Sequence, residues 1–411
     1  MRVVHFIANT KLHARVLSLM ILLGTVVVAL GTPIPVVHAQ TKIATITVGS
    51  NPMGVAYDSS KGEIFVANSG GNAVSVISDQ TNELVATIPV GSGPSGLVYD
   101  PAKGEVFVCN FDGGRGSTIS VISDTTNRVI TNLTVGEGPQ FIAYDSSKGE
   151  LFVTNSGAGT VSVISDESDQ VVATVNVGLG PAGIAYDSGR GELFVANSRG
   201  NNVSVISDSA NSVVTRLVAS GNPMGVAYDP PKGEIFVASN SGTLLFIIND
   251  STNNVVSAVP LGSAPYDAAY DSSNGEVFVT NSLSTYISVV SDATNNVVGR
   301  VSAGGYTYGI AYDSAKHEMF AASGSKSVVV IADTSSRTTS TVSGGSSSST
   351  LTASQSSLSV SITHSSSSLS NTDRSGSTSN SSVPYLFIVI GVVLILVVLG
   401  IVIIIVRRRK K

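Results

Sequence analysis

Residues 51–92 read NPMGVAYDSSKGEIFVANSGGNAVSVISDQTNELVATIPVGS, and a unit of this kind occurs seven times before residue 335. A Tyr-Asp pair marks each unit, and a glutamate follows six residues after the tyrosine, as Glu63 follows Tyr57. Successive tyrosines are 42 residues apart, except for 45 between the second and the third. A fixed period of this length means that one supersecondary structure is repeated along the chain. The seven marker tyrosines are Tyr57, Tyr99, Tyr144, Tyr186, Tyr228, Tyr270 and Tyr312.

Each unit contains four short runs that are rich in β-branched and aromatic residues. In the first unit they are residues 54–58, 63–68, 73–79 and 83–90, and Gly, Asn, Asp, Ser or Pro separates them, as hairpins require. Several runs are apolar on both faces, which is expected where a sheet packs between two others. The sequence therefore predicts an all-β fold, a seven-bladed β-propeller of four-stranded antiparallel blades.

The ends of the repeat predict how the ring closes. The seventh unit stops after its third run, residues 327–333, whereas residues 42–48 (KIATITV) match the fourth run of the other units. We expect this N-terminal strand to complete the last blade, because the pairing removes two exposed sheet edges. The propeller is assigned to residues 42–335. Its single cysteine, Cys109, has no partner for an internal disulfide and stands where other units have a small strand residue.

The segments outside the repeat predict export and anchoring. Residues 1–39 combine three basic residues, an apolar run and small residues before position 40, as a secretory signal peptide does. Residues 384–406 form the predicted transmembrane helix, since its uncharged residues 385–406 alone reach about 33 Å. The basic residues 407–411 should remain in the cytoplasm. We therefore expect a single-pass protein of the cell membrane, with the propeller extracellular and the C-terminus cytoplasmic.

Two further features fit an exported chain. Residues 336–383 are mostly Ser and Thr, a composition typical of a disordered or O-glycosylated stalk. Four Asn-x-Ser/Thr sequences are candidate N-glycosylation sites in a glycoprotein. They begin at Asn132, Asn202, Asn249 and Asn380.

The charge of the exported part limits its partners. Three basic residues lie in the signal peptide and five in the tail, which leaves 15 basic against 28 acidic residues, a net charge of −13. This balance argues against nucleic acid as a partner. Of the 28 acidic residues, 21 occupy the same three positions of every unit, so roles in turns and strand ends account for them better than catalysis does.

Several strings within the repeat resemble those of a known family. The sequences FVTN at 152–155 and 278–281, FVAN at 65–68 and 194–197, and the VSVIS runs that follow are similar to the YVTN family of β-propeller repeats, with Phe in place of the Tyr that gives the family its name. The resemblance covers residues 42–335. It implies a surface-layer-type exported protein, of archaeal origin, and no single activity, because one fold serves many functions.

Function is sought where the chain departs from its own pattern. In a propeller, the connections from strand 4 to the next strand 1 and from strand 2 to strand 3 share one face. The aromatic and charged departures on that face predict a rim for peptide or sugar recognition; drift of the loop sequences after duplication is the competing interpretation. The candidate binding residues are Tyr266, Tyr286, Tyr306, Tyr308, Phe141, Asp267, Phe111, Asp112 and Arg115.

An enzyme is the alternative, since some seven-bladed propellers are lactonases or lyases. Such chemistry needs a His base, a metal or paired carboxylates. His317 is the only histidine of the repeat and stands in a predicted turn, while Asp112, Glu137 and Asp267 belong to different units. We expect no catalytic residue, metal or cofactor. The predicted function is that of a cell-surface module for binding a protein or glycan, or for building a surface-layer-like coat.

Overall fold

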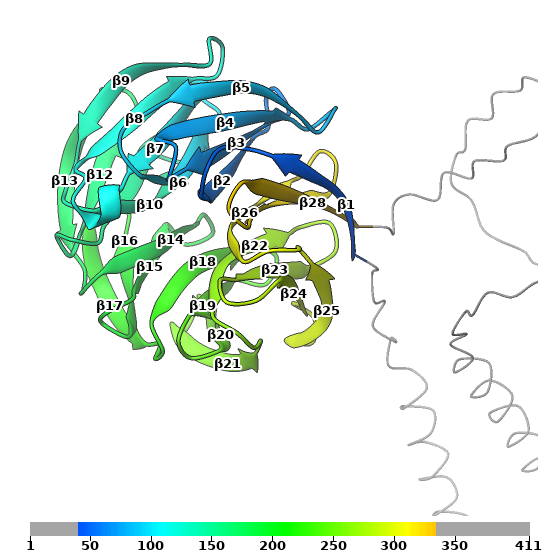
Figure 1. The fold of residues 1–411 in the computed structure, drawn as a ribbon. Helices are drawn as coiled ribbons and strands as arrows, with labels where there is room; N and C mark the ends of the chain where they lie inside the picture. The colour runs from blue at the N-terminus through cyan, green and yellow to red at the C-terminus, as the bar shows by residue number, and fades with distance from the viewer. Residues whose placement is uncertain (1–39, 334–411) are drawn as a thin grey trace, which may run out of the picture. The chain divides into compact units, whose positions relative to one another are not determined.

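The computed structural model describes residues 40–333, which form seven four-stranded antiparallel sheets arranged in a ring (Figure 1). The predicted signal peptide, stalk, membrane span and tail lie outside these residues, as does the sequon at Asn380. Six of the blades follow the order of the chain, from the innermost strand at the central axis to the outermost strand at the rim, and the last blade takes its outermost strand from the N-terminus. The predicted fold class, a seven-bladed β-propeller, is confirmed.

The innermost strands are β2 (Pro52–Asp58), β6 (Pro94–Asp100), β10 (Pro139–Asp145), β14 (Pro181–Asp187), β18 (Pro223–Asp229), β22 (Pro265–Asp271) and β26 (Thr307–Asp313). The second strands are β3 (Glu63–Asn68), β7 (Glu105–Asn110), β11 (Glu150–Asn155), β15 (Glu192–Asn197), β19 (Glu234–Ser239), β23 (Glu276–Asn281) and β27 (Glu318–Ser323). The third strands are β4 (Ala73–Ser78), β8 (Thr118–Ser123), β12 (Thr160–Ser165), β16 (Asn202–Ser207), β20 (Leu244–Asn249), β24 (Tyr286–Ser291) and β28 (Ser327–Asp333). The outermost strands are β5 (Glu83–Pro89), β9 (Arg128–Thr134), β13 (Gln170–Asn176), β17 (Ser212–Val218), β21 (Asn254–Pro260), β25 (Asn296–Ser302) and, in the last blade, β1 (Gln40–Thr47).

The N-terminal strand closes the ring as predicted. The last sheet has the order β1-β28-β27-β26, and β1 is antiparallel to β28, with Ile46 opposite Val328 (Figure 1). The Gln40 side chain also donates a hydrogen bond to Glu276 in the preceding blade. The first and last strands of the propeller are therefore paired directly, so the ring is closed without a covalent link.

The innermost strands are longer than the sequence predicted. In the first blade the strand begins at Pro52 instead of residue 54, because Pro52 pairs with Asn68 across a bulge that contains Met53 and Gly54. The same register shift occurs in the innermost strand of every blade. A bulge bends the strand and redirects its side chains, so this segment departs from the regular ladder beside the axis.

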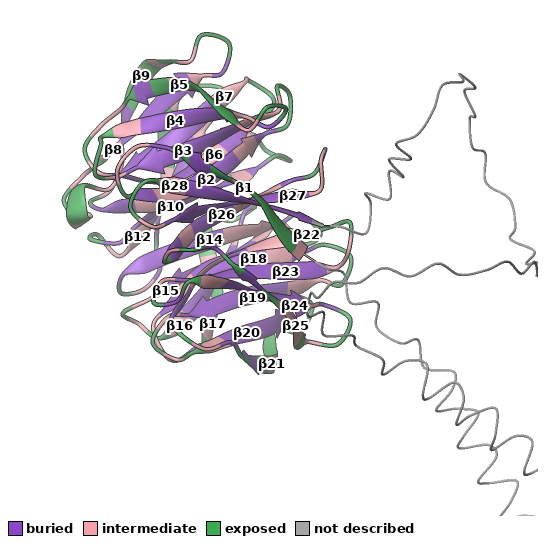
Figure 2. Cartoon of the chain, turned by 45° about the vertical axis from the view of Figure 1, so that its right-hand side comes forward, coloured by how far each residue is buried: buried purple, intermediate pink, exposed green. Residues whose placement is uncertain are grey.

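The core lies between the blades. Each second strand contributes a phenylalanine that is almost fully buried, such as Phe65, which packs in one cluster with Leu97 and Val106 of the next blade. Figure 2 shows the second and third strands largely buried and the connections exposed. Because each sheet packs against two neighbours, both of its faces are apolar, as the sequence pattern indicated.

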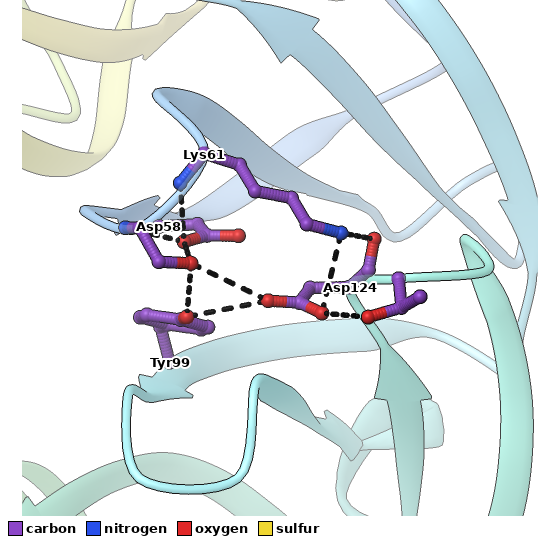
Figure 3. A network of polar contacts seen from close by, with 6 residues as sticks. Asp58, Lys61, Tyr99 and Asp124 are labelled. Atoms are coloured by element: carbon purple, nitrogen blue, oxygen red, sulfur yellow. Dashed lines mark hydrogen bonds and ion pairs between the residues drawn. The ribbon is translucent and has the colours of Figure 1, made fainter.

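The marker residues of the repeat join neighbouring blades on the face that carries the hairpins between strands 1 and 2. Asp58 accepts hydrogen bonds from the backbone N–H groups of Ser60 and Lys61, at 2.8 and 3.2 Å. The Tyr99 hydroxyl lies 2.6 Å from Ser60 Oγ, and Lys61 Nζ lies 3.3 Å from Asp124 Oδ1 of the second blade (Figure 3). The equivalent pairs elsewhere are Lys148–Asp208, Lys232–Asp292 and Lys316–Asp79. These repeated acids have structural contacts, in agreement with the sequence interpretation.

Candidate functional site

The second residue of each innermost strand lies in the bulge, at the face that carries the connections between blades. We call this the mouth position. Its residue differs from blade to blade, whereas the flanking positions repeat closely. The seven mouth-position residues are Met53, Ser95, Gln140, Ala182, Met224, Tyr266 and Tyr308.

Two hollows adjoin one another over the axis on this face, with volumes of about 480 and 450 Å³. Both are lined by Met53 and Ser69, and we call them together the axial mouth. The larger hollow brings Tyr266 of the sixth blade together with Phe111 and Asp112, which belong to the insertion in the second blade. The insertion, residues 110–118, contains the short 3-10 helix η1 (Asp112–Gly114). Side chains far apart in the sequence thus share one surface.

Three of the four predicted tyrosines belong to the axial mouth. Tyr306 and Tyr308 line the smaller hollow, and Tyr306 is 52% exposed. The rings of Tyr266 and Tyr308 meet edge to face, with their centroids 5.4 Å apart and their planes at 88°. This arrangement is favourable for aromatic pairs. The pair therefore holds two phenol groups in place beside the axis.

Tyr286 and Arg115 line neither hollow, although the sequence placed them on the same face. Tyr286 begins the third strand β24, two strands farther from the axis than β22, and the guanidinium of Arg300 lies 4.9 Å from its ring centroid. Arg115 is exposed and follows η1. A shared face does not bring residues together when they lie at different distances from the axis.

The residue after the mouth position is glycine in five blades because the innermost strands approach one another closely. A Cβ atom at Gly54 would lie 2.2 Å from the carbonyl oxygen of Ser95, and one at Gly309 would lie 2.2 Å from that of Met53. Phe141 and Asp267 replace this glycine in the third and sixth blades. Both side chains lie at the axis, beneath the mouth.

A narrow constriction and a chamber lie beneath the axial mouth. The constriction has a volume of about 10 Å³ and is lined by Met53, Phe141 and Tyr266, among others. The chamber has a volume of about 140 Å³, and Phe141 and Asp267 line it as well. Each innermost strand also contributes one aliphatic residue to the chamber: Val55, Leu97, Ile142, Ile184, Val226, Ala268 and Ile310.

Asp267 carries the only ionisable side chain that lines the chamber. Its Oδ1 accepts a hydrogen bond from the N–H of Ala268 at 2.9 Å, and its Oδ2 accepts one from the N–H of Ile310 at 3.3 Å. Burial raises the pKa of Asp267 to about 7, since it disfavours the charged form, while the two backbone donors act in the opposite direction. Within residues 40–333, Asp267 forms no ion pair.

Two threonines hold the exceptional residues, and sequence reasoning missed them. Thr154 Oγ1 accepts a hydrogen bond from the N–H of Phe141 at 3.0 Å and donates one to its carbonyl oxygen at 3.2 Å. Thr280 Oγ1 likewise accepts a hydrogen bond from the N–H of Asp267, and its hydroxyl hydrogen is shared between the carbonyl oxygens of Asp267 and Tyr308. The other five blades have Ala or Cys at this position. The signal was present in the FVTN strings, which occur only in the two units that lack the glycine.

The candidate glycosylation sites differ in how their amides are used. Asn132 is exposed on the outermost strand β9, and its Oδ1 accepts a hydrogen bond from Ser120. The amide of Asn202 is held at both ends, because it donates to Gly200 O and accepts from Asn197. Asn249 accepts hydrogen bonds from Ser251 and Thr252 in a local turn. Of the three, only Asn202 uses in a hydrogen bond the Nδ2 atom to which a glycan would be attached.

The groups considered for catalysis remain apart. His317 Nδ1 lies 2.9 Å from the hydroxyl of Tyr312, in a hairpin on the face opposite the mouth. Asp112 lines the mouth, Asp267 lines the chamber and Glu137 lines neither. Among residues 40–333, no group of three or more His, Cys, Asp or Glu side chains is arranged to hold a metal ion. Burial raises the pKa of Cys109, which therefore favours the neutral thiol.

In comparisons with known proteins, no family model and no curated sequence matches this chain. The class of protein is defined by the fold: a seven-bladed β-propeller whose last blade is completed by its N-terminal strand. In the part of the chain that the structure describes, no helix is long and apolar enough to cross a membrane. The predicted span, residues 384–406, lies outside that part.

Proposed function

We propose that this protein is a membrane-anchored, extracellular propeller of YVTN type, which binds a protein or glycan ligand at the axial mouth. The carrying observation is the convergence of Tyr266, Tyr306, Tyr308 and Phe111 on two adjoining hollows. Aromatic side chains offer apolar area with a polar tip, which suits both peptides and sugars. Display in a surface-layer-like coat is compatible with this function, because the mouth occupies only one face of the ring.

Binding is favoured over catalysis by the positions of the acidic and aromatic residues. The marker tyrosines and aspartates hold hairpins and blade contacts on the opposite face. The mouth instead contains neutral aromatic and amide groups, with Asp112 at its edge. This composition resembles a recognition surface more than a site for acid-base chemistry.

The proposal is tested with glycan and peptide arrays probed with the full-length chain. Tyr308→Met is the informative variant, because Met53 and Met224 occupy the same position in sibling blades and the fold tolerates methionine there. A central aromatic anchor contributes more than about 2 kcal/mol, so we expect affinity to fall about 30-fold.

The matched control is Tyr286→Thr, which removes a tyrosine outside the mouth and copies Thr118 and Thr160 of sibling blades. It should leave affinity unchanged. Equal binding by the wild type and by a Tyr306→Ser, Tyr308→Met double variant would favour loop drift over recognition.

A further inference from the structure

The chamber beneath the mouth has an unusual composition for a channel interior. Its lining combines one carboxyl group, one aromatic ring and seven aliphatic side chains. Gly225 of the neighbouring blade leaves the space that the carboxyl group occupies, since a Cβ atom there would lie 2.5 Å from Asp267 Oδ1. The packing thus accommodates an acid at a position where five blades have only glycine.

An acid in such surroundings selects a particular kind of ligand. A buried charge is costly unless a partner of opposite sign accompanies it. A divalent metal ion would require several oxygen ligands, whereas the chamber offers a single carboxylate. A primary ammonium requires one anion, and its alkyl stem can lie against aliphatic walls. Phe141 and Tyr266 line the constriction, and aromatic rings attract a cation that lies over their faces.

We infer that the chamber binds a primary alkylammonium group, which enters from the axial mouth and pairs with Asp267. The inference rests on the proposed function of the mouth and names the chemistry that the mouth selects. Met53 lines the mouth and the constriction, and its flexible side chain can turn aside to admit a slender alkyl chain. A lysine side chain of a peptide and a free alkylamine share this chemistry.

Pairing requires the ionised form of Asp267, so binding depends on pH. The titratable group beside it on β22 is the phenol of Tyr266, whose pKa is raised by burial. The adjoining strands β26 and β18 contribute Tyr308 and Gly225. The ammonium keeps its proton near pH 7. Affinity should therefore rise between pH 6 and pH 8, since the pKa of Asp267 lies at about 7.

The test is calorimetric titration of the full-length chain with n-butylammonium, with Nα-acetyl-lysine amide and with the neutral alcohol n-pentanol, which is one methylene longer than the butyl compound. We expect both amines to bind and pentanol to bind at least tenfold more weakly. Asp267→Asn keeps the shape of the side chain and should lower amine affinity at least tenfold. Asp267→Gly restores the residue of five sibling blades, so it should fold normally and show the same loss.

Equal affinity for the amines and for pentanol, or unchanged amine binding in both Asp267 variants, would overturn the inference. Tighter binding of the lysine derivative than of butylammonium would support it and identify a peptide as the source of the ammonium; the reverse order would support it and identify a free amine. If Asp267→Gly binds both amines as tightly as the wild type does, and still captures the array ligand at wild-type strength, only this inference fails. Loss of capture in the Tyr308→Met variant would still support the axial mouth as the binding site.

Discussion

At the residue scale, the residue after the mouth position has two roles in the innermost strands. In five blades this residue is glycine, because the carbonyl group of the next blade leaves no room for a side chain, as at Gly54. In the other two, Phe141 and Asp267 extend into the axis, and Thr154 and Thr280 hold their backbones through hydroxyl groups. Each residue that replaces the glycine is therefore accompanied by a threonine on the adjacent strand, which holds its backbone. Such paired departures are harder to explain by drift of loop sequences than single ones.

The carboxyl group of Asp267 makes the stability of the propeller depend on pH. Its pKa of about 7 in the folded state exceeds the ordinary value of about 3.9, so the folded state binds more protons between these values. The resulting stabilisation is fully present below about pH 4 and is lost as the pH rises through 7. We expect the melting temperature of the wild type, relative to that of Asp267→Asn, to be higher at pH 5 than at pH 8.

Differential scanning calorimetry of the two proteins at both pH values checks this prediction. The comparison removes the contribution of other acids with raised pKa values, such as Asp229 and Glu63, because both proteins contain them. Melting temperatures that change in parallel with pH would show that Asp267 does not contribute.

At the scale of the element, the last blade differs from the others in having an outermost strand that comes from the opposite end of the sequence. Ile46 of β1 and Ile88 of β5 occupy equivalent positions, and both are buried in clusters between blades. Strand β1 therefore packs in the last blade as the fourth strand does in the other blades. Its pairing with β28 extends over seven pairs of residues.

This equivalence predicts equal costs for matched substitutions. Ile46→Ala and Ile88→Ala each delete a buried side chain and should each lower the free energy of unfolding by about 2–5 kcal/mol. Chemical denaturation followed by circular dichroism measures both values. Removal of residues 40–47 should have a far larger effect and cause aggregation, because β28 would become an exposed edge.

A much smaller cost for Ile46→Ala than for Ile88→Ala would mean that the closing strand is frayed in solution. A truncated protein that remains monodisperse by light scattering, with an unchanged melting temperature, would contradict closure by β1.

At the scale of the whole molecule, the two faces of the ring have different roles. The face with the hairpins between strands 1 and 2 carries repeated contacts such as Lys61–Asp124, which recur in equivalent form between four pairs of blades. The other face carries the axial mouth, to which unlike residues of several blades contribute. The repeated residues therefore stabilise the contacts between blades on one face, and the residues that depart from the repeat form the candidate site on the other.

The orientation proposed for the whole chain can be tested on intact cells. If residues 384–406 span the membrane and residues 407–411 remain inside, protease added outside should release a fragment that contains the propeller. A tag placed after Lys411 should stay protected until the cells are opened. Immunoblots of the released and retained fractions show both results, and a permeabilised sample is the control. Digestion of the tag in sealed cells would reverse the orientation.

The sequence alone determined the number of blades, their four strands and the closing role of the N-terminal strand, because the 42-residue period and the alternation of apolar runs with turn residues are local properties. It also identified Tyr266, Tyr308, Phe111 and Asp267 as departures from the repeat. Only the tertiary structure decided which departures meet. Distance from the axis separates Tyr286 from the mouth, and the bulge of the innermost strand places Asp267 beneath it. The distance of a residue from the axis and its place above or below the mouth are not local properties, since both depend on how seven sheets pack around one axis.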